Sequence, residues 1–343
     1  MEWGITVEPV NYSAHAIEGL KQFADDLSSW APASYQALHN VIGMLQDGVK
    51  FLLPNKCELL DPTELGQTHL DLIKLPFPCT IFEAPWHGEG DIISVGDVKQ
   101  VPATKRIALC WESTSDYEPL PRLDKIHKSF PKGGIFVYSI FWVPSFNRWV
   151  PSVGGCFVPY DNKVIKLDLE NALPASRIAN EAVIKSGLAQ EKGAKQYRSE
   201  PFFLLPEVFE RSVQAYGSSD RAFADILMET RDETMMLIQA CSVLNCANIE
   251  TGEIEAPIAL NKKRVAKGLQ PFFSYKVLQL SEKRFGGDDS NFGGTHAAPR
   301  MHLRRGHLRR LETRTIWIRP AMVNANSAIG IVEKDYKLRR KTD

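Results

Sequence analysis

The acidic and basic residues of this chain are distributed very unevenly along it. The 343 residues include 41 Lys/Arg and 41 Asp/Glu, so the formal net charge is zero. The segment from Leu260 to Asp343 nevertheless holds 19 Lys/Arg and 7 Asp/Glu, a net charge of +12. Residues 1–259 therefore hold 22 Lys/Arg and 34 Asp/Glu, a net charge of −12. This split predicts an acidic domain, residues 1–255, and a basic C-terminal module, residues 256–343, that faces a polyanion. The alternative is that the acidic part folds onto the basic part and neutralises it internally.

The overall composition is typical of a soluble globular protein. Hydrophobic residues make up 44% of the chain and charged residues 24%, and the length allows one large domain or two ordinary ones. The longest apolar stretches, such as residues 134–143, are too short to span a bilayer. The N-terminal residues show no basic start followed by an apolar segment. We therefore expect a cytoplasmic protein with no membrane partner.

The cysteines and glycines give no sign of a metal or a cofactor. The six cysteines are scattered, and no two have the C-x-x-C spacing of a zinc site or redox motif. We expect reduced and mostly buried thiols. The glycine-rich segment 286–295 lacks the pattern of a nucleotide-binding P-loop. No cofactor and no metal site are predicted.

The hydrophobic pattern predicts an α+β fold with helices at the N-terminus. Ala16, Leu20, Phe23 and Leu27 recur at helical spacing, and a second apolar stripe follows Ser34, a candidate N-cap residue. A further helical segment is expected between residues 169 and 247. Its last helix, residues 230–247, carries enough Met and Leu to be buried.

Strands are expected between these helical parts and again near the C-terminus. Short apolar and aromatic runs bounded by turn residues predict a central antiparallel sheet; they cover residues 80–86, 106–111, 134–143 and 155–160. Four tryptophans of this region are expected in the core: Trp86, Trp111, Trp142 and Trp149. The basic C-terminal module is expected to be rich in strands, with one at residues 272–280 and one at residues 315–324.

The C-terminal module contains an unusual concentration of arginine and histidine, which we call the Arg/His cluster. Its members are Arg300, His302, Arg304, Arg305, His307, Arg309 and Arg310. The planar guanidinium group can donate two hydrogen bonds to two phosphate oxygens and stays charged. Five such groups within eleven residues repel one another unless an anion lies among them. We therefore predict that the cluster binds nucleic acid, with affinity that falls steeply with salt.

Several alternatives for the cluster remain open at this stage. As one strand it would place His302, Arg304 and Arg310 on one face, whereas as a helix it would align His302, Arg305 and Arg309. His302 and His307 are also candidates for the general base and acid of a metal-independent endoribonuclease. A solvated basic face, a DNA-binding regulator and a metal site are further possibilities, although two histidines are too few for a metal. Trp317 either stacks on a base or belongs to the core.

The same residues resemble the C-terminal signature of a type V-A anti-CRISPR family with phage and plasmid relatives. The resemblance rests on the run from Arg300 to His307, on residues 317–324 (WIRPAMVN) and on residues 260–263 (LNKK). It covers about the last eighty residues. Met301 stands where the family has proline, and Leu308-Arg309 replaces a Trp-His pair, so a third histidine is lost.

The resemblance implies a function that composition alone does not suggest. Members of this family lower the amount of a CRISPR effector nuclease by recognising its nascent polypeptide during translation and causing loss of the mRNA. By resemblance, this chain is a phage-encoded adaptor in the cytoplasm of a bacterial host, and its partners are a nascent polypeptide and the ribosome or RNA. The Arg/His cluster would contact the RNA. The resemblance leaves the peptide target and the peptide-binding groove unassigned.

Overall fold

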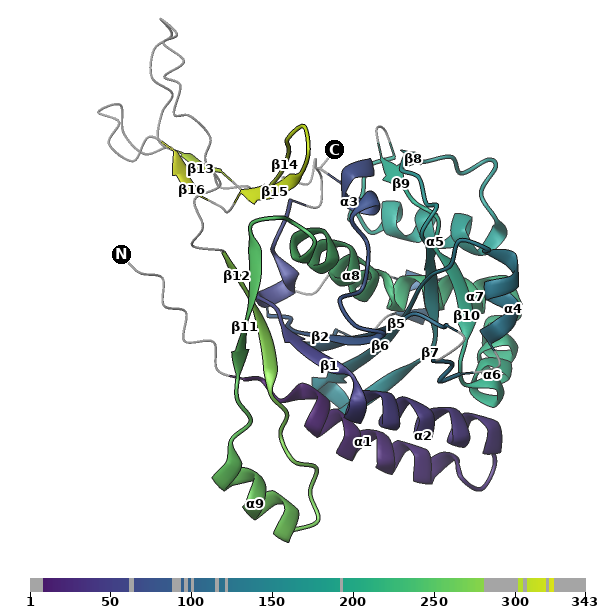
Figure 1. Cartoon of the computed structure of the whole chain (residues 1–343). Coiled ribbons are helices and arrows are strands. Elements are labelled where there is room, and N and C mark those ends of the chain that lie inside the picture. Colours follow the sequence, from purple (N-terminus) through teal and green to yellow (C-terminus); the bar gives the residue numbers. More distant parts are fainter. Residues whose placement is uncertain are drawn as a thin grey trace, which may run out of the picture.

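The computed structural model describes residues 9–61, 65–87, 94–95, 98–99, 102–114, 117–120, 123–191, 194–280, 302–304, 307–318 and 321–323. It has an α+β fold, as the sequence predicted, built on a mixed sheet of eight strands (Figure 1). The strands of this sheet, in spatial order, are β10 (Glu200–Phe203), β7 (Arg148–Pro159), β6 (Gly134–Val143), β5 (Lys105–Trp111), β2 (Cys79–Pro85), β1 (Val49–Leu52), β12 (Tyr275–Leu280) and β11 (Ile249–Ile254).

Helices cover both faces of the sheet, except that the last helix that the structure describes lies at the tip of the β11–β12 hairpin (Figure 1). They are α1 (Tyr12–Leu27), α2 (Pro32–Asp47), α3 (Gln67–Asp71), α4 (Asp124–Ser129), α5 (Pro174–Lys185), α6 (Pro206–Tyr216), α7 (Ser219–Glu229), α8 (Arg231–Leu244) and α9 (Ile258–Ala266), with short 3₁₀ turns at Asn55–Cys57 and Pro144–Phe146. Small two-stranded sheets pair β3 (Ser94–Val95) with β4 (Val98–Lys99), β8 (Ile165–Lys166) with β9 (Lys195–Gln196), β13 (His302–Arg304) with β16 (Ala321–Val323), and β14 (His307–Arg310) with β15 (Thr315–Ile318).

The expected antiparallel sheet forms one part of the observed one. Strands β2, β5, β6, β7 and β10 pair antiparallel with their neighbours. The sheet as a whole is mixed, because β1 runs parallel to both β2 and β12. Strand β1 follows α2 directly and is only four residues long, too short for alternation along the sequence to reveal it.

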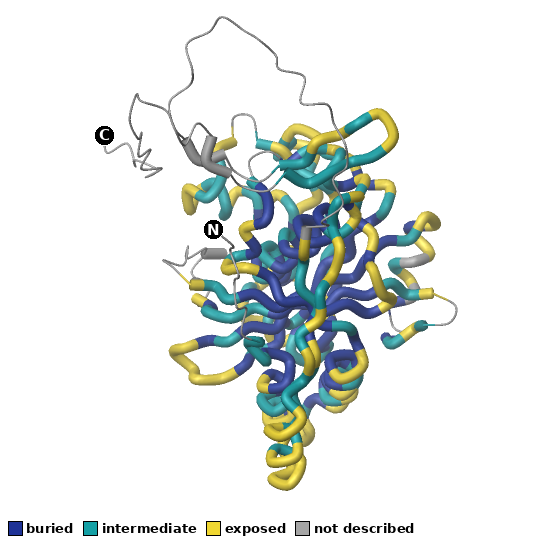
Figure 2. The backbone as a smooth tube through the Cα atoms, turned by 60° about the vertical axis from the view of Figure 1, so that its left-hand side comes forward, coloured by how far each residue is buried: buried dark blue, intermediate teal, exposed yellow. Residues whose placement is uncertain are grey.

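The core lies in two layers on opposite faces of the sheet. Alternate residues of β5 show this division, since Ile107, Leu109 and Trp111 pack with α1 and α2, whereas Ala108 and Cys110 pack with α8. Figure 2 shows the buried strands in the middle of the molecule, covered on both sides. The predicted core position of Trp111 and Trp149 is confirmed, since both are buried, and Trp86 and Trp142 are partly buried against the two layers.

Carboxylates from distant elements hold the first turns of the two N-terminal helices. Glu83 of β2 accepts hydrogen bonds from the backbone N–H groups of Tyr12 and Ser13 at 2.9 Å each, at the start of α1. Glu207 of α6 does the same for Ala33 and Ser34 in α2, again at 2.9 Å. The expected N-cap role of Ser34 is wrong, because Pro32 already begins the helix and the Ser34 hydroxyl donates to Glu207.

The β-rich end of the chain is partly integrated into this body. Strand β11 precedes the predicted domain boundary after residue 255 and β12 follows it, yet the two strands are hydrogen-bonded neighbours over six residues. Strand β12 also confirms the strand expected at residues 272–280. The large sheet thus draws strands from both sides of that boundary, while the small pairs β13–β16 and β14–β15 lie beyond it.

Candidate nucleic-acid interface

Trp317 anchors the hairpin of β14 and β15 to the rest of the described structure. Trp317 donates its indole N–H to the Leu59 carbonyl at 3.3 Å, and its backbone N–H and carbonyl both bond to the side chain of Asn248, at 2.9 and 2.7 Å. Leu308, opposite Trp317 in the register, packs with it against the core layer that contains α8. Trp317 is therefore half-buried against the core and anchors the hairpin to it.

This attachment leaves the arginines of β14 on the outside. Arg309 and Arg310 are exposed, next to the half-buried Leu308. Among the residues that the structure describes, no carboxylate forms an ion pair with either guanidinium. Internal neutralisation by the acidic domain was the alternative to polyanion binding, and the described part of the chain shows none at these two positions. Arg309 and Arg310 follow each other along β14, so they point to opposite faces of the hairpin, and each guanidinium group can make its own bidentate contact to phosphate.

The remaining members of the Arg/His cluster are less fully described. His307 begins β14, and the backbone of His302 and Arg304 forms β13, opposite Val323 and Ala321 of β16. Arg300 and Arg305 lie outside the described residues. The strand alternative therefore holds for both described segments, and the helix alternative does not. The single continuous strand is wrong in detail, because β13 and β14 pair with different partners.

The body contains arginine in the opposite situation. Arg106 of β5 donates to Glu233 at 2.9 Å and pairs with Asp232 at 3.1 Å, and its guanidinium lies over the Trp86 ring. Glu233 is fully buried and also accepts a hydrogen bond from Ser139 at 2.9 Å. This charge is therefore compensated by two carboxylates inside the fold.

Three carboxylates are spaced four residues apart along α7 and α8, namely Asp225, Glu229 and Glu233. Burial, followed by the nearby charge of Asp225, raises the pKa of Glu229 to about 8. Burial also raises the pKa of Asp225, and Ser152 donates to Glu229 at 2.8 Å. Our sequence reasoning missed this group, although i, i+4, i+8 spacing within a helical segment was a visible signal. Because Glu229 lies packed under β7, we treat the group as structural.

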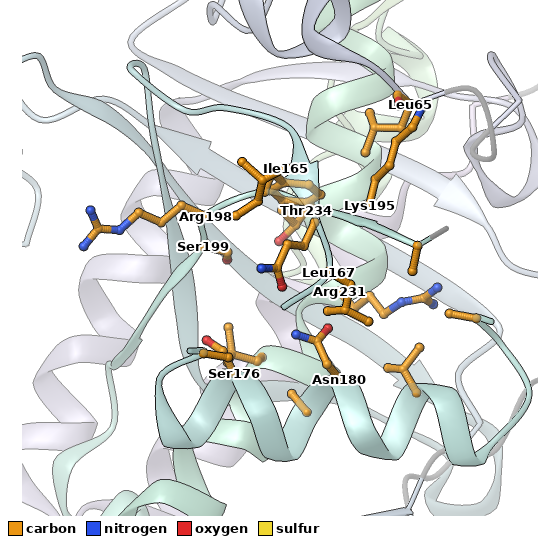
Figure 3. Close-up of a pocket in the computed structure, with 18 of the residues that line it drawn as sticks. Leu65, Ile165, Leu167, Ser176, Asn180, Lys195, Arg198, Ser199, Arg231 and Thr234 are labelled. Atoms are coloured by element: carbon orange, nitrogen blue, oxygen red, sulfur yellow. Dashed lines mark hydrogen bonds between the residues drawn. The ribbon is translucent and has the colours of Figure 1, made fainter. Parts of the chain in front are cut away.

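A cavity lies between α5, the β8–β9 pair and the α7–α8 junction. Its volume is about 1140 Å³. In Figure 3, Ser176 and Asn180 project from α5 towards Leu167 and Arg231, whereas the side chain of Arg198 points away. The lining combines aliphatic side chains with amide, hydroxyl and basic groups. A cavity of this size and mixed character has room for a short segment of polypeptide as well as for a small molecule.

The described residues provide neither a reactive thiol nor a metal site. All six cysteines are free and buried, as expected, and burial raises the pKa of the Cys57, Cys110 and Cys241 thiols above the ordinary value. Buried thiols with raised pKa values are poor nucleophiles. Within the described part of the chain, no group of three or more His, Cys, Asp or Glu side chains is placed to hold a metal, and no helix is long and apolar enough to cross a membrane.

Comparison of the chain with protein-family models, with curated proteins and with solved structures found no match. The function of this chain is therefore inferred from its residues and from their placement in the fold.

Proposed function

We propose that this protein is a phage-encoded adaptor that binds RNA at the translating bacterial ribosome, recognises a nascent polypeptide there and causes loss of the mRNA being translated. The Arg/His cluster supplies the RNA contact. The family resemblance of the same residues supports the link to the nascent chain. The adaptor itself needs no cofactor and no catalytic step, since removal of the message is left to a nuclease of the host.

The observation that carries the RNA contact is the state of Arg309 and Arg310. Both are exposed on a hairpin that Trp317 fixes to the core, and neither has a carboxylate partner among the described residues. The backbone that carries both arginines is anchored, and the planar arginine fork loses less freedom per hydrogen bond to phosphate than a lysine ammonium does. The many phosphates of RNA supply the anionic counterpart that the basic module requires.

The cavity beside α5 supports the second half of the proposal. Its volume and mixed lining have room for an extended peptide segment, and its lining residues belong to the acidic domain rather than to the basic module. Peptide recognition and RNA contact would then use separate surfaces of the one chain. This separation makes the two halves of the proposal independently testable.

Ribosome co-sedimentation tests the RNA contact. The double substitution Arg309→Glu/Arg310→Glu is expected to abolish co-sedimentation with salt-washed bacterial ribosomes while leaving the melting temperature nearly unchanged, because both side chains are exposed. Arg177→Glu/Lys185→Glu makes the same charge change on the exposed surface of α5 and is expected to bind like the wild type. Undiminished co-sedimentation of the Arg309/Arg310 variant would remove the RNA role from β14.

Incubation of the purified protein with RNA in EDTA separates the adaptor from an enzyme. Intact RNA together with salt-sensitive binding is expected. Cleavage that His302→Ala or His307→Ala abolishes would instead make the chain a metal-independent endoribonuclease. Equal competition by duplex DNA would indicate a nucleic-acid-binding regulator.

Filling the cavity tests the peptide contact. Ser176→Trp places a large ring where the Ser176 side chain faces the cavity, and Arg177→Trp places the same ring on the neighbouring residue, which does not line it. The nascent chains and messages that co-purify with the protein from translating cells are expected to lose their enrichment only with Ser176→Trp. Unchanged enrichment with that variant would assign peptide recognition to another surface.

A further inference from the structure

Helix α9 and the turn after it carry an exceptional set of exposed aliphatic side chains. Ile258 is 75% exposed, Val265 60%, Leu260 45% and Leu269 39%. Figure 1 shows α9 at the tip of the hairpin formed by β11 and β12, and Figure 2 shows that this tip is almost entirely exposed. Aliphatic side chains gathered at a protruding tip mark a surface that another molecule covers.

The tip is held firmly despite its exposure. Arg264 donates to Glu18 of α1 at 2.6 Å and to the Gln270 carbonyl at 2.7 Å. The Asn261 side chain exchanges two hydrogen bonds with the backbone of Phe272, at 2.8 and 2.7 Å. The helix ends at Ala266, and two residues later Gly268 turns the chain with a φ of +69°, the left-handed conformation that glycine adopts readily. The exposed residues are therefore presented on a fixed helix.

The charge of the tip is entirely basic. No Asp or Glu occurs between Glu255 and Glu282, and the exposed basic residues of the tip are Lys262, Lys263 and Lys267. Among the described residues none of these three ammonium groups has an ion-pair partner, whereas Arg264 is used for anchoring. Ile258, Lys262 and Val265 stand at i, i+4 and i+7, so they lie along one side of the helix.

The combination of aliphatic and basic side chains determines the class of partner. Burying a large aliphatic side chain contributes more to binding than an exposed ion pair does. A phosphate backbone offers nothing that could bury Ile258 or Val265, but an apolar groove in a protein does, and acidic residues at its rim would pair with the lysines. We propose that α9 docks into an acidic-rimmed apolar groove of a protein on the ribosome surface. This inference rests on the proposed function for the place where the partner is found.

Binding of the full-length chain to salt-washed bacterial ribosomes tests the inference. The exposed anchors are removed by Ile258→Ser/Val265→Ser, which is expected to weaken the association roughly tenfold or more. Phe146→Ser is the matched control, since Phe146 is 54% exposed in the β6–β7 connection, far along the chain from α9. The melting temperature of each variant is measured as a control and is expected to match the wild type, because the substituted side chains are exposed.

The class of partner is identified by photo-crosslinking with benzoylphenylalanine in place of Val265. A crosslinked product that resists ribonuclease and is removed by protease is expected. A product that ribonuclease removes would mean that α9 contacts ribosomal RNA, and the protein-groove inference would be overturned. Suppose that the wild type binds ribosomes, that Ile258→Ser/Val265→Ser binds them equally well, and that benzoylphenylalanine at position 265 gives no crosslink to a protein. The inference about α9 would then be wrong, while the proposed function would stand. Failure of the wild type to bind ribosomes overturns the proposed function together with it.

Discussion

Arg106 and the pair Arg309–Arg310 show two fates of the same side chain in one protein. Arg106 lies between β5 and α8, only 15% of its side chain is exposed, and two carboxylates compensate its charge. Arg309 and Arg310 are exposed on β14 and, within the described residues, have no carboxylate partner. The first arrangement holds layers of the fold together. The second contributes nothing visible to the fold, and this difference is why we propose β14 as a surface that contacts a partner.

The largest effect is expected where the charge is compensated inside. Arg106→Met would leave Glu233 buried without its cation, and breaking a buried pair in this way costs about 3–5 kcal/mol of unfolding free energy. Urea denaturation followed by circular dichroism measures it. The exposed Arg177→Met is the control and should lie close to the wild type. A loss for Arg106→Met no larger than that of the control would show that Glu233 does not depend on this pair.

The second effect depends on pH and concerns Glu229, next to the same network. Since burial and Asp225 raise its pKa from 4.5 to about 8, the folded protein binds this proton more tightly than the unfolded chain does. Its contribution to stability is therefore fully present below about pH 4.5 and is lost as the pH rises through about 8. Between about pH 6 and pH 9 the wild type should lose stability that Glu229→Gln retains.

The measurement for Glu229 is the urea midpoint across this pH range. The amide of Glu229→Gln cannot ionise and can still accept the hydrogen bond from Ser152, so its midpoint should be nearly flat with pH. Equal slopes for the two proteins would place the titrating group elsewhere in the chain.

A smaller effect is expected at the start of α2, where a carboxylate is used as a cap. Although burial acts to raise it, hydrogen bonds from Ser34 and from the backbone of Ala33 hold the pKa of Glu207 below its ordinary value. Glu207→Ala should cost about 1 kcal/mol of stability near neutral pH. Because the folded pKa is lowered, this contribution should disappear as the pH falls below about 4. Glu210→Ala, which changes an exposed residue of the same helix, is the control.

The local elements of this fold were predictable and its long-range contacts were not. Periodicity located α1, α2, α8 and most central strands, because each pattern lies within a few turns or residues. The sequence could not show that Glu207 would cap a helix that begins at Pro32, or that Arg106 would pair with Glu233. Such contacts depend on how layers pack, which no local pattern contains. The parallel position of β1 was missed for the same reason.

The candidate site was predictable in its chemistry and only partly in its geometry. The density of arginine in the Arg/His cluster is a property of the sequence and was read from it directly. The sequence could not predict the break between β13 and β14. It arises because β13 pairs with β16 and β14 pairs with β15, and such pairing depends on distant residues. The sequence does not reveal the anchoring role of Trp317, because an aromatic residue beside basic ones is equally typical of a core and of a base-stacking surface.

The smallest effect on stability should accompany a large effect on binding, at Arg309 and Arg310. Arg309→Ala/Arg310→Ala is expected to change the unfolding free energy by no more than about 0.5 kcal/mol, because exposed side chains without partners contribute little to folding. For single-stranded RNA each phosphate contact contributes about 0.7 to the slope of log affinity against log salt, so removing two contacts should make this slope shallower by about 1.4. Fluorescence anisotropy with labelled RNA across a salt series measures this slope. A stability loss comparable to that of Arg106→Met, with an unchanged slope, would mean that these arginines serve the fold and that the contrast between the two regions does not mark a binding surface.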